Sequence, residues 1–281
     1  MGSAMIHFWK MNGAGNDFVM LDNRTLQHAL SKEQIAALCD RHRGVGADGL
    51  LAVEPAQHGA DFRMRYYNAD GGEAEMCGNG ARCFARFANM LAGWNLERVS
   101  FETPAGVIGA TYHGDNVCIV MSDPHDHRPG LALDVCGQQK TVHFINTGVP
   151  HAVVVVENLE TVPVREWGAA LRYHTGFAPK GTNANFLKAT PEGITIRTYE
   201  RGVEDETLAC GTGMVACALV HHELTGALSP VKVKVKGGDT LEIGFEKTAG
   251  GYRHVTLTGP ADIVFEGQVK LHGQPSIRDQ S

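Results

Sequence analysis

A duplicated pattern constrains the fold of this chain more than any other feature of its sequence. Met76-Cys77-Gly78-Asn79-Gly80 and Ala209-Cys210-Gly211-Thr212-Gly213 each place a cysteine directly before Gly-x-Gly. Around them, "FRMRYYNADGGEAEMCGNGARCFARF" and "ITIRTYERGVEDETLACGTGMVACAL" both predict a strand, a turn, the cysteine motif and a helix. Three further predicted strands follow each helix. A repeat on this scale indicates the duplication of a whole domain and not a short solenoid unit.

Most of the remaining chain favours strands, because apolar and polar residues alternate, as in "VKVKVK" and "TLEIGF". The intervening "KGGDT" is typical of a hairpin turn. Ser31-Lys32-Glu33-Gln34 has the pattern of a capping box at a helix start. The predicted helices are residues 32–41, 79–91, 163–173 and 212–224. The predicted strands are residues 6–11, 18–21, 50–54, 62–67, 99–102, 107–113, 116–121, 141–146, 152–157, 194–199, 231–236, 240–245 and 252–258.

These elements predict an α+β fold of two pseudo-symmetric domains, each a mainly antiparallel β-sheet or barrel wrapped around a central α-helix. The stretch "SDPHDHRPG", residues 122–130, is rich in Pro, Asp and Gly and is the expected boundary. We therefore expect an N-terminal domain over 1–126 and a C-terminal domain over 127–264. The tail, 265–281, is expected to pack back on the first domain. Residues 1–4 are left out of the fold prediction.

Composition excludes several classes of function. The net charge is −6 and no basic tract is present, which argues against a nucleic-acid partner. The longest purely aliphatic run, residues 152–156, is too short to span a membrane, and "MGSAMIHFWK" has no signal-like apolar region, so a cytoplasmic location is expected. Seven cysteines without a C-x-x-C pair indicate free thiols and no structural zinc. Gly44 to Gly49 match G-x-G-x-x-G, but a helix precedes them and a strand follows, the reverse of a nucleotide site.

The two cysteine motifs predict acid–base chemistry. A cysteine at a helix start lies at the positive end of the helix dipole, which favours thiolate over thiol. The following glycines let backbone N–H groups approach an anion closely. If duplication places Cys77 and Cys210 face to face, one thiolate can remove an α-proton while the other thiol delivers a proton to the opposite face. The cysteine of a single Cys-Gly pair is more often a small buried apolar residue than a catalytic one. The other five cysteines lack a paired motif and are expected to be ordinary core or surface thiols.

Six motifs make nearly the whole chain resemble the diaminopimelate epimerase family: "KMNGAGNDF" (10–18), "GVGADGL" (44–50), "NADGGEAEMCGNGARC" (68–83), "NTGVPH" (146–151), "GTNANF" (181–186) and "YERGVEDETLACGTG" (199–213). The resemblance implies a cofactor-independent epimerase without a metal, which interconverts LL- and meso-diaminopimelate in lysine and peptidoglycan precursor synthesis. It also implies a homodimer, with diaminopimelate as the small-molecule partner.

The resemblance implies a role for each matched residue. Cys77 and Cys210 correspond to the two catalytic thiols, and His151 and Glu200 to residues that tune them. The residues implied to bind substrate are Asn16, Asn68, Gly78, Asn79, Asn183, Glu200, Arg201, Gly211 and Thr212. Among these, Gly78, Asn79, Gly211 and Thr212 form the carboxylate cradle, and Glu200 with Arg201 holds the second amino-acid end.

The chain also departs from the family pattern. Some members have Gln where Gly49 stands, and many have Asn where Val149 stands, so two side-chain contacts to substrate are absent here.

Two alternative functions stay open. A proline or hydroxyproline racemase shares the fold, but typically has His in place of Asn79. A non-catalytic amino-acid binding protein is the other, although binding needs no thiols. Deuterium uptake by diaminopimelate or by proline discriminates among the three.

Overall fold

The computed structural model describes residues 5–74 and 76–271. The four α-helices of this part of the chain match the predicted ones: α1 (Lys32–Cys39), α2 (Gly78–Leu91), α3 (Val164–Arg172) and α4 (Gly211–Thr225), with a short 3-10 helix at Thr175–Phe177. The capping box forms, because the Ser31 side chain accepts from the Gln34 N–H and the Gln34 side chain accepts from the Ser31 N–H. None of these helices combines the length and apolar character needed to cross a membrane.

The strands fall into two matching sets. In the N-terminal half they are β1 (Met5–Gly13), β2 (Asn16–Asp22), β3 (Gly49–Pro55), β4 (Phe62–Asn68), β5 (Arg98–Thr103), β6 (Gly106–His113) and β7 (Asn116–Val120). In the C-terminal half they are β9 (Gln138–Asn146), β10 (Pro150–Val155), β11 (Asn183–Thr190), β12 (Gly193–Glu200), β13 (Asp205–Thr207), β14 (Val231–Lys234), β15 (Thr240–Thr248) and β16 (Gly251–Pro260). Two more strands, β8 (His125–Val135) and β17 (Asp262–Lys270), follow the two halves.

Both halves pair their strands in the same order. From β1 to β7, neighbours pair antiparallel except β2 with β3 and β4 with β5, which are parallel. From β9 to β16, the parallel pairs are β10 with β11 and β12 with β14, at the equivalent places. The short β13, which pairs with β12, has no counterpart. The duplication predicted from the sequence is therefore present in the topology, and β7 joins the halves by pairing with β16.

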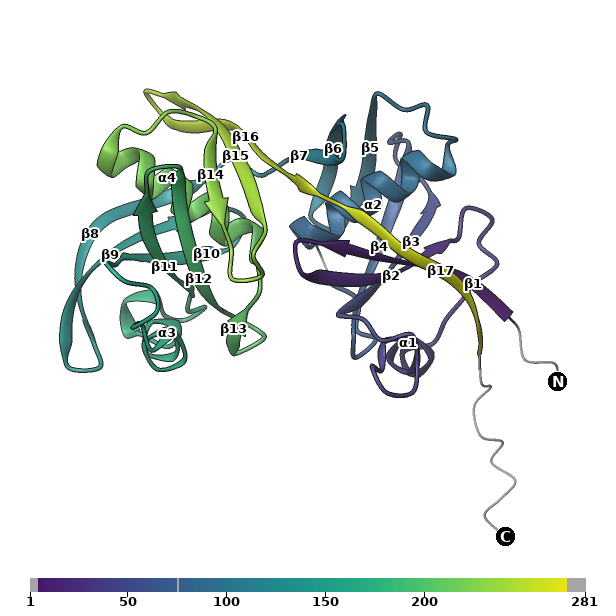
Figure 1. The fold of residues 1–281 in the computed structure, drawn as a ribbon, viewed down its shortest axis with the longest axis horizontal. Helices are drawn as coiled ribbons and strands as arrows, with labels where there is room; N and C mark the ends of the chain where they lie inside the picture. The colour runs from purple at the N-terminus through teal and green to yellow at the C-terminus, as the bar shows by residue number, and fades with distance from the viewer. Residues whose placement is uncertain (1–4, 75, 272–281) are drawn as a thin grey trace, which may run out of the picture.

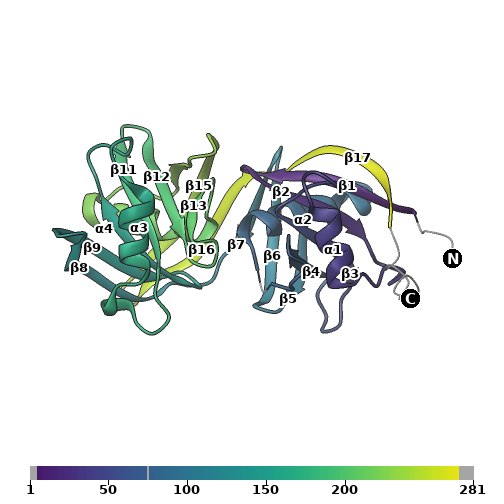
Figure 2. The same ribbon diagram turned by 90° about the horizontal axis from the view of Figure 1, so that it is seen from below.

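The halves also exchange their last strands. β8 follows the N-terminal half but pairs with β9, and β17 follows the C-terminal half but pairs with β1 from Met5–Lys270 to Asn12–Asp262. Figure 1 shows both crossings between the two halves, and Figure 2 shows them from below. The expected boundary segment, residues 122–130, overlaps β8 from His125 onward, where an edge strand with bulges accommodates Pro129. The boundary at 126 stays a prediction, and residues 1–4 and 272–281 lie outside the described part.

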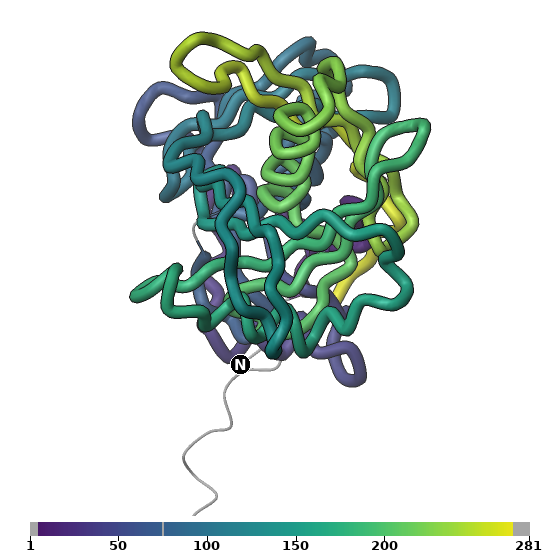
Figure 3. Tube along the Cα trace, turned by 90° about the vertical axis from the view of Figure 1, so that its left-hand side faces the viewer, coloured from purple at the N-terminus to yellow at the C-terminus, as the bar shows by residue number. Residues whose placement is uncertain are grey.

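The central helices lie inside their sheets. Residues Met214 to Val220 of α4 are all fully buried, and Figure 3 shows this helix within a ring of strands. One hydrophobic cluster contains Phe84 of α2, Leu219 of α4 and Leu257 of β16, so it spans both halves. Two smaller clusters lie under α1 and α3. This packing fixes the N-termini of α2 and α4 at the centre of the molecule.

Candidate active site

The two cysteine motifs meet where the central helices begin. Cys77 is the N-cap residue of α2, and Cys210 is the N-cap residue of α4. A Cβ built on Gly211 would lie 3.5 Å from the Cα of Gly78, and Leu257 Cδ2 lies 3.3 Å from the Cβ position of either glycine. The two helix ends are therefore close enough for a Cβ on either glycine to be in van der Waals contact with the other.

Burial sets the protonation of both thiols in this state. Burial raises the pKa of Cys77, although the backbone N–H groups of Gly80 and Asn79 lower it. Burial also raises the pKa of Cys210 well above its usual range, with a further increase from Glu200 and a smaller opposing effect of Thr212. The expectation that the helix start favours thiolate over thiol is therefore not met in this structure, because loss of hydration outweighs the helix dipole.

On the Cys77 side, one amide connects the thiol to a charged network. The Cys77 Sγ donates to Asn16 Oδ1 at 3.5 Å, and Asn79 Nδ2 donates to the same oxygen at 3.5 Å. The other end of the amide, Asn16 Nδ2, donates to Asp48 Oδ2 at 2.6 Å. Because a carboxylate only accepts, this contact fixes the amide orientation and turns the carbonyl oxygen toward the thiol.

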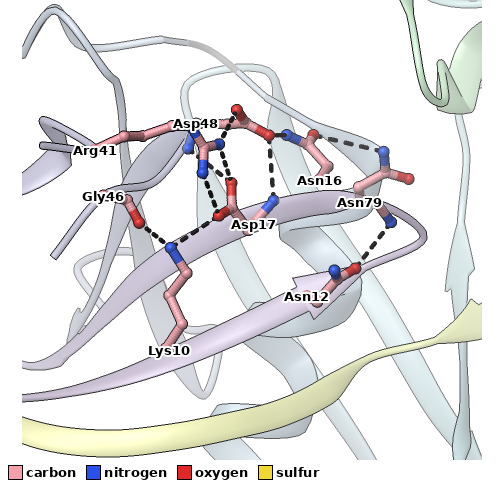
Figure 4. A network of polar contacts seen from close by, with 9 residues as sticks. Lys10, Asn12, Asn16, Asp17, Arg41, Gly46, Asp48 and Asn79 are labelled. Atoms are coloured by element: carbon pink, nitrogen blue, oxygen red, sulfur yellow. Dashed lines mark hydrogen bonds and ion pairs between the residues drawn. The ribbon is translucent and has the colours of Figure 1, made fainter. Parts of the chain in front are cut away.

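The network behind Asn16 was not predicted from the sequence (Figure 4). Arg41 Nη2 lies 2.8 Å from Asp48 Oδ1 and 2.7 Å from Asp17 Oδ1, and Lys10 Nζ lies 2.8 Å from Asp17 Oδ2. Burial alone would raise the pKa of Asp17, but hydrogen bonds from Arg41 and Lys10 hold that pKa well below its usual range. The ion pairs thus hold Asp48, and through it Asn16, in place.

Sequence analysis also missed a buried cation beside Cys77. Arg82 of α2 is fully buried and donates to Asn79 Oδ1 at 3.0 Å, to Gly78 O at 3.3 Å and to Pro260 O at 3.3 Å. Burial lowers the pKa of its guanidinium. The available signal was the position of Arg82, in the first turns of the helix predicted to follow Cys77.

On the Cys210 side, four polar residues from four elements form a chain. Thr212 Oγ1 lies 3.6 Å from Cys210 Sγ and 2.9 Å from His151 Nε2. The other ring nitrogen, His151 Nδ1, lies 3.1 Å from Asn185 Nδ2, and Thr198 Oγ1 donates to Asn185 Oδ1 at 3.0 Å. The predicted residue His151 therefore reaches the thiol only through Thr212.

Burial, together with the charge of Arg201, lowers the pKa of His151 to about 3, so the ring is neutral near neutral pH. Asn185 and Thr198 were not predicted. Their signal was the spacing of Asn183 and Asn185, because residues two apart on a strand share one face.

Glu200, Arg201 and Asn183 lie together but face different groups. Glu200 accepts from Thr207 Oγ1 at 2.9 Å, burial raises the pKa of its carboxyl, and its charge raises the pKa of both thiols. The backbone N–H of Arg201 donates to Asn183 Oδ1 at 2.8 Å, and its Nη1 donates to Lys180 O at 3.3 Å. Glu200 therefore acts electrostatically on the two thiols, while the guanidinium of Arg201 contacts the Lys180 backbone.

Asn68, at the end of β4, contacts the site residues described above through no hydrogen bond in the described part of the chain. It is exposed, and its Oδ1 accepts from the hydroxyl of Tyr66 at 3.0 Å. A Cβ on Gly49 would lie 2.9 Å from Tyr66 Cε2 and 2.5 Å from Tyr67 O. Glycine at position 49 is thus required by the packing of Tyr66 and the strand beside it. In the described part of the chain, no group of three or more His, Cys, Asp or Glu residues is placed to hold a metal ion.

Comparison with known sequences gives one consistent result. A family model described as diaminopimelate epimerase matches residues 8–127 and 143–264. The diaminopimelate epimerase of Chlorobaculum tepidum is 43% identical over 265 residues, covering 93% of this chain and 100% of that protein. The diaminopimelate epimerase of Aquifex aeolicus is 44% identical over 277 residues, covering 94% and 98%.

Solved structures share the architecture at low identity. A phenazine biosynthesis protein of the PhzF family from Bacillus anthracis has a TM-score of 0.73 at 15% identity and covers 95% of this chain and 99% of that one. A probable proline racemase from Agrobacterium radiobacter has a TM-score of 0.68 at 17% identity, with coverage of 95% and 93%. At such identities these likenesses show the fold alone.

Proposed function

The chain belongs to the diaminopimelate epimerase family, and on that premise we propose that it interconverts LL- and meso-diaminopimelate with Cys77 and Cys210 as its two acid–base groups. The observation that carries the proposal is the contact between the two helix N-termini, each capped by one of these cysteines. It is an isomerase that needs no pyridoxal cofactor in this scheme, because the thiols themselves move the protons.

Each turnover uses the two thiols in opposite protonation states. The thiolate of one cysteine removes the α-hydrogen as a proton from one face, and the thiol of the other delivers a proton to the opposite face. The carboxylate of the reacting centre binds the backbone N–H groups at the two helix starts, Gly78 with Asn79 and Gly211 with Thr212. These donors stabilise the negative charge that develops on the carboxylate during abstraction.

Burial works against the first step, because it raises the pKa of both thiols. We attribute the compensation to the substrate, whose α-ammonium brings a positive charge beside the sulfur. Arg82 adds a positive charge that lowers the pKa of Cys77. A thiolate therefore forms when substrate occupies the site, which restricts the base to productive complexes.

The remaining predicted residues bind the rest of the substrate in this proposal. Glu200 and Arg201 hold the second amino-acid end, and Asn16, Asn68 and Asn183 orient the chain between the two ends. Diaminopimelate has a second carboxylate and a second ammonium that this charged pair can bind. Proline has only one amino-acid end and therefore leaves the pair without a partner.

Deuterium oxide tests the mechanism. In a two-base reaction, early product carries deuterium at the inverted centre while the remaining substrate is nearly unlabelled, because the incoming hydrogen comes from an exchanged thiol. Cys77→Ala and Cys210→Ala should each abolish epimerisation, about equally, since cooperating residues do not contribute additively. Near wild-type epimerisation by either variant would refute the two-thiol scheme.

Substrate choice is tested with the same assay. Diaminopimelate should incorporate deuterium at its α-carbon, and proline should not. Incorporation into proline alone would favour the racemase alternative, and incorporation into neither, by folded protein with both thiols reduced, would favour a binding protein.

We also propose a homodimer that acts in the cytoplasm. Supporting the dimer, β17 exposes three consecutive apolar residues, Ile263, Val264 and Phe265, at 37%, 58% and 48%. Such patches commonly mark protein interfaces. Light scattering during size-exclusion chromatography measures the mass directly, and a monomer at assay concentration would overturn the dimer.

A further inference from the structure

The hydrogen-bond chain that ends at Cys210 has a fixed direction. Asn185 Nδ2 lies 3.0 Å from Ala152 O, a carbonyl that only accepts, while Asn185 Oδ1 accepts from Thr198 at 3.0 Å. Reversing the amide would place two oxygens against each other at Ala152. Asn185 is fully buried, so such a mismatch would be uncompensated by water. The amide therefore directs its second N–H at His151 Nδ1, 3.1 Å away.

This contact decides the tautomer of His151. Because Nδ1 accepts from Asn185, the single ring proton of the neutral imidazole is on Nε2. Nε2 then donates to Thr212 Oγ1 at 2.9 Å. With its oxygen already accepting, the Thr212 hydroxyl has its own hydrogen free for the sulfur of Cys210 at 3.6 Å. The chain thus presents a donor to this sulfur, and a donor favours the thiolate.

The Cys77 side has the opposite polarity. There the amide of Asn16, fixed by Asp48, presents its carbonyl oxygen to the thiol and accepts its S–H. The residues of the Cys210 chain, on β10, β11, β12 and α4, make no hydrogen bond to Asn16 or Cys77 within the described residues. Cys77 therefore serves as an internal reference for changes that the hydrogen-bond chain transmits from Asn185 to Cys210.

We propose that Asn185 is a positioning residue that fixes the ring of His151, so that the Thr212 hydroxyl donates to the sulfur of Cys210 and prepares it to act as a base. Thr198 holds the amide in that orientation. Gly213 leaves the space that the amide needs, because a Cβ there would lie 2.5 Å from Asn185 Oδ1. The proposal rests on the proposed role of Cys210, but its tests read tautomer and thiol reactivity, so it can fail while the epimerase function stands.

Other ionisable groups also act on this chain. The pKa of Cys210 is raised by Glu200 of β12 and by Cys77 of α2, and Cys210 in turn raises the pKa of Cys217 of α4. Arg201 lowers the pKa of His151. None of them is altered in the variants below, and a double-mutant cycle accounts for the charge that Asn185→Asp introduces.

Nitrogen NMR of the wild-type protein gives the first test and carries no risk of misfolding. The signal of His151 is assigned among the fourteen histidines by comparison with His151→Gln. We expect a neutral ring protonated at Nε2 near neutral pH. Protonation at Nδ1, or an imidazolium, would overturn the proposal.

Site-resolved alkylation gives the second test. Wild type and Asn185→Asp are treated with iodoacetamide over a range of pH, and modification of Cys210 and Cys77 is followed separately by peptide mass spectrometry. Asp keeps the shape of Asn but only accepts, so the ring should protonate at Nδ1 and the Thr212 hydroxyl should turn from the sulfur to Nε2. The alkylation midpoint of Cys210 should rise by about one pH unit, a roughly tenfold slower reaction at fixed pH, while that of Cys77 stays unchanged. No shift, or equal shifts at both thiols, would contradict the proposal.

A double-mutant cycle separates the chain from the charge that Asp introduces. Thr212→Val removes the hydroxyl that links His151 to Cys210. In that background, adding Asn185→Asp should change the alkylation midpoint of Cys210 little. A shift of the Cys210 midpoint that persists in full would mean a through-space charge effect and would contradict the proposal.

Should Asn185→Asp fail to fold, Thr198→Val tests the same link without a new charge. It should raise the Cys210 midpoint, whereas Thr198→Ser, which keeps the hydroxyl, should not. Equal midpoints in these two variants would count against the proposal.

Discussion

The second glycine of each cysteine motif provides a sharp test of how the two halves differ. Gly80 and Gly213 occupy equivalent positions in the repeat, both in the first turn of a central helix. In the N-terminal half, a Cβ on Gly80 would meet Leu51 Cδ1 and Phe18 Cζ at 3.4 Å, which is ordinary contact. On Gly213 it would lie 2.5 Å from Asn185 Oδ1, where contact normally begins near 3.4 Å. We expect Gly80→Ala to be tolerated and Gly213→Ala to be harmful.

The magnitude follows from what Asn185 would have to give up. Its amide is held by Thr198, His151 and Ala152, so it cannot move aside without breaking these bonds. Overpacking costs about 1–3 kcal/mol and each weakened hydrogen bond about 1 kcal/mol. Replacing a helical glycine by alanine returns up to about 1 kcal/mol. Gly213→Ala should therefore lower the free energy of unfolding by about 1–3 kcal/mol, and Gly80→Ala should leave it within about 0.5 kcal/mol or raise it slightly.

Urea denaturation measures the change in the free energy of unfolding, and the rate of α-deuterium incorporation measures the change in epimerase activity. Gly213→Ala should also slow epimerisation more than its loss of stability explains, because displacing Asn185 releases His151 and Thr212. Alkylation should show a raised midpoint at Cys210 only. Equal stability and equal activity in the two alanine variants would refute the reasoning, since it would mean that the amide yields without cost.

Three further outcomes are expected. Arg201→Ala should lose roughly 2–5 kcal/mol of transition-state binding for diaminopimelate if its guanidinium pairs with a buried carboxylate; unchanged kcat/KM would remove Arg201 from the site. Mild oxidation should link Cys77 to Cys210 and abolish activity reversibly with dithiothreitol, and peptide mapping of inactive protein with both cysteines free would argue against the facing arrangement. Acid should weaken the fold through His151, whose folded pKa of about 3 lies below the ordinary 6.5. The contribution of neutral His151 to the free energy of unfolding is complete above pH 6.5 and is lost as pH falls toward 3. The loss is about 2 kcal/mol between pH 7 and 5. His151→Gln should show a correspondingly smaller loss over that interval in urea titrations.

Local signals determined the helices and the duplication. The capping box at Ser31 acts between residues three apart, and Gly226 adopts the left-handed conformation, with φ of 73°, directly after α4. Such signals need no distant partner, and a glycine with positive φ follows each central helix, Gly93 after α2 and Gly226 after α4. The sequence therefore predicted both central helices to within a residue of where they start and end.

Three strands without a clear strand pattern in the sequence were missed. β11 begins with Asn183 and includes Asn185, both buried, so its polar interior hides the strand pattern. β17 exposes apolar residues and exists because it pairs with β1, at the other end of the chain. β8 contains Pro129, which reads as a loop but is accommodated at an edge with bulges.

At the site, the sequence by itself determined the two cysteines and their glycines, since the repeat makes them stand out without any contact being known. Only the tertiary structure decided how each thiol is held. Asn16 acquires its direction from Asp48, 32 residues later in the chain, and His151 acquires its tautomer from Asn185 on a neighbouring strand. The thiol pKa values show the same division. A helix start is a local property and favours thiolate, but loss of hydration depends on how completely the two halves enclose the sulfur, and that enclosure raises both pKa values.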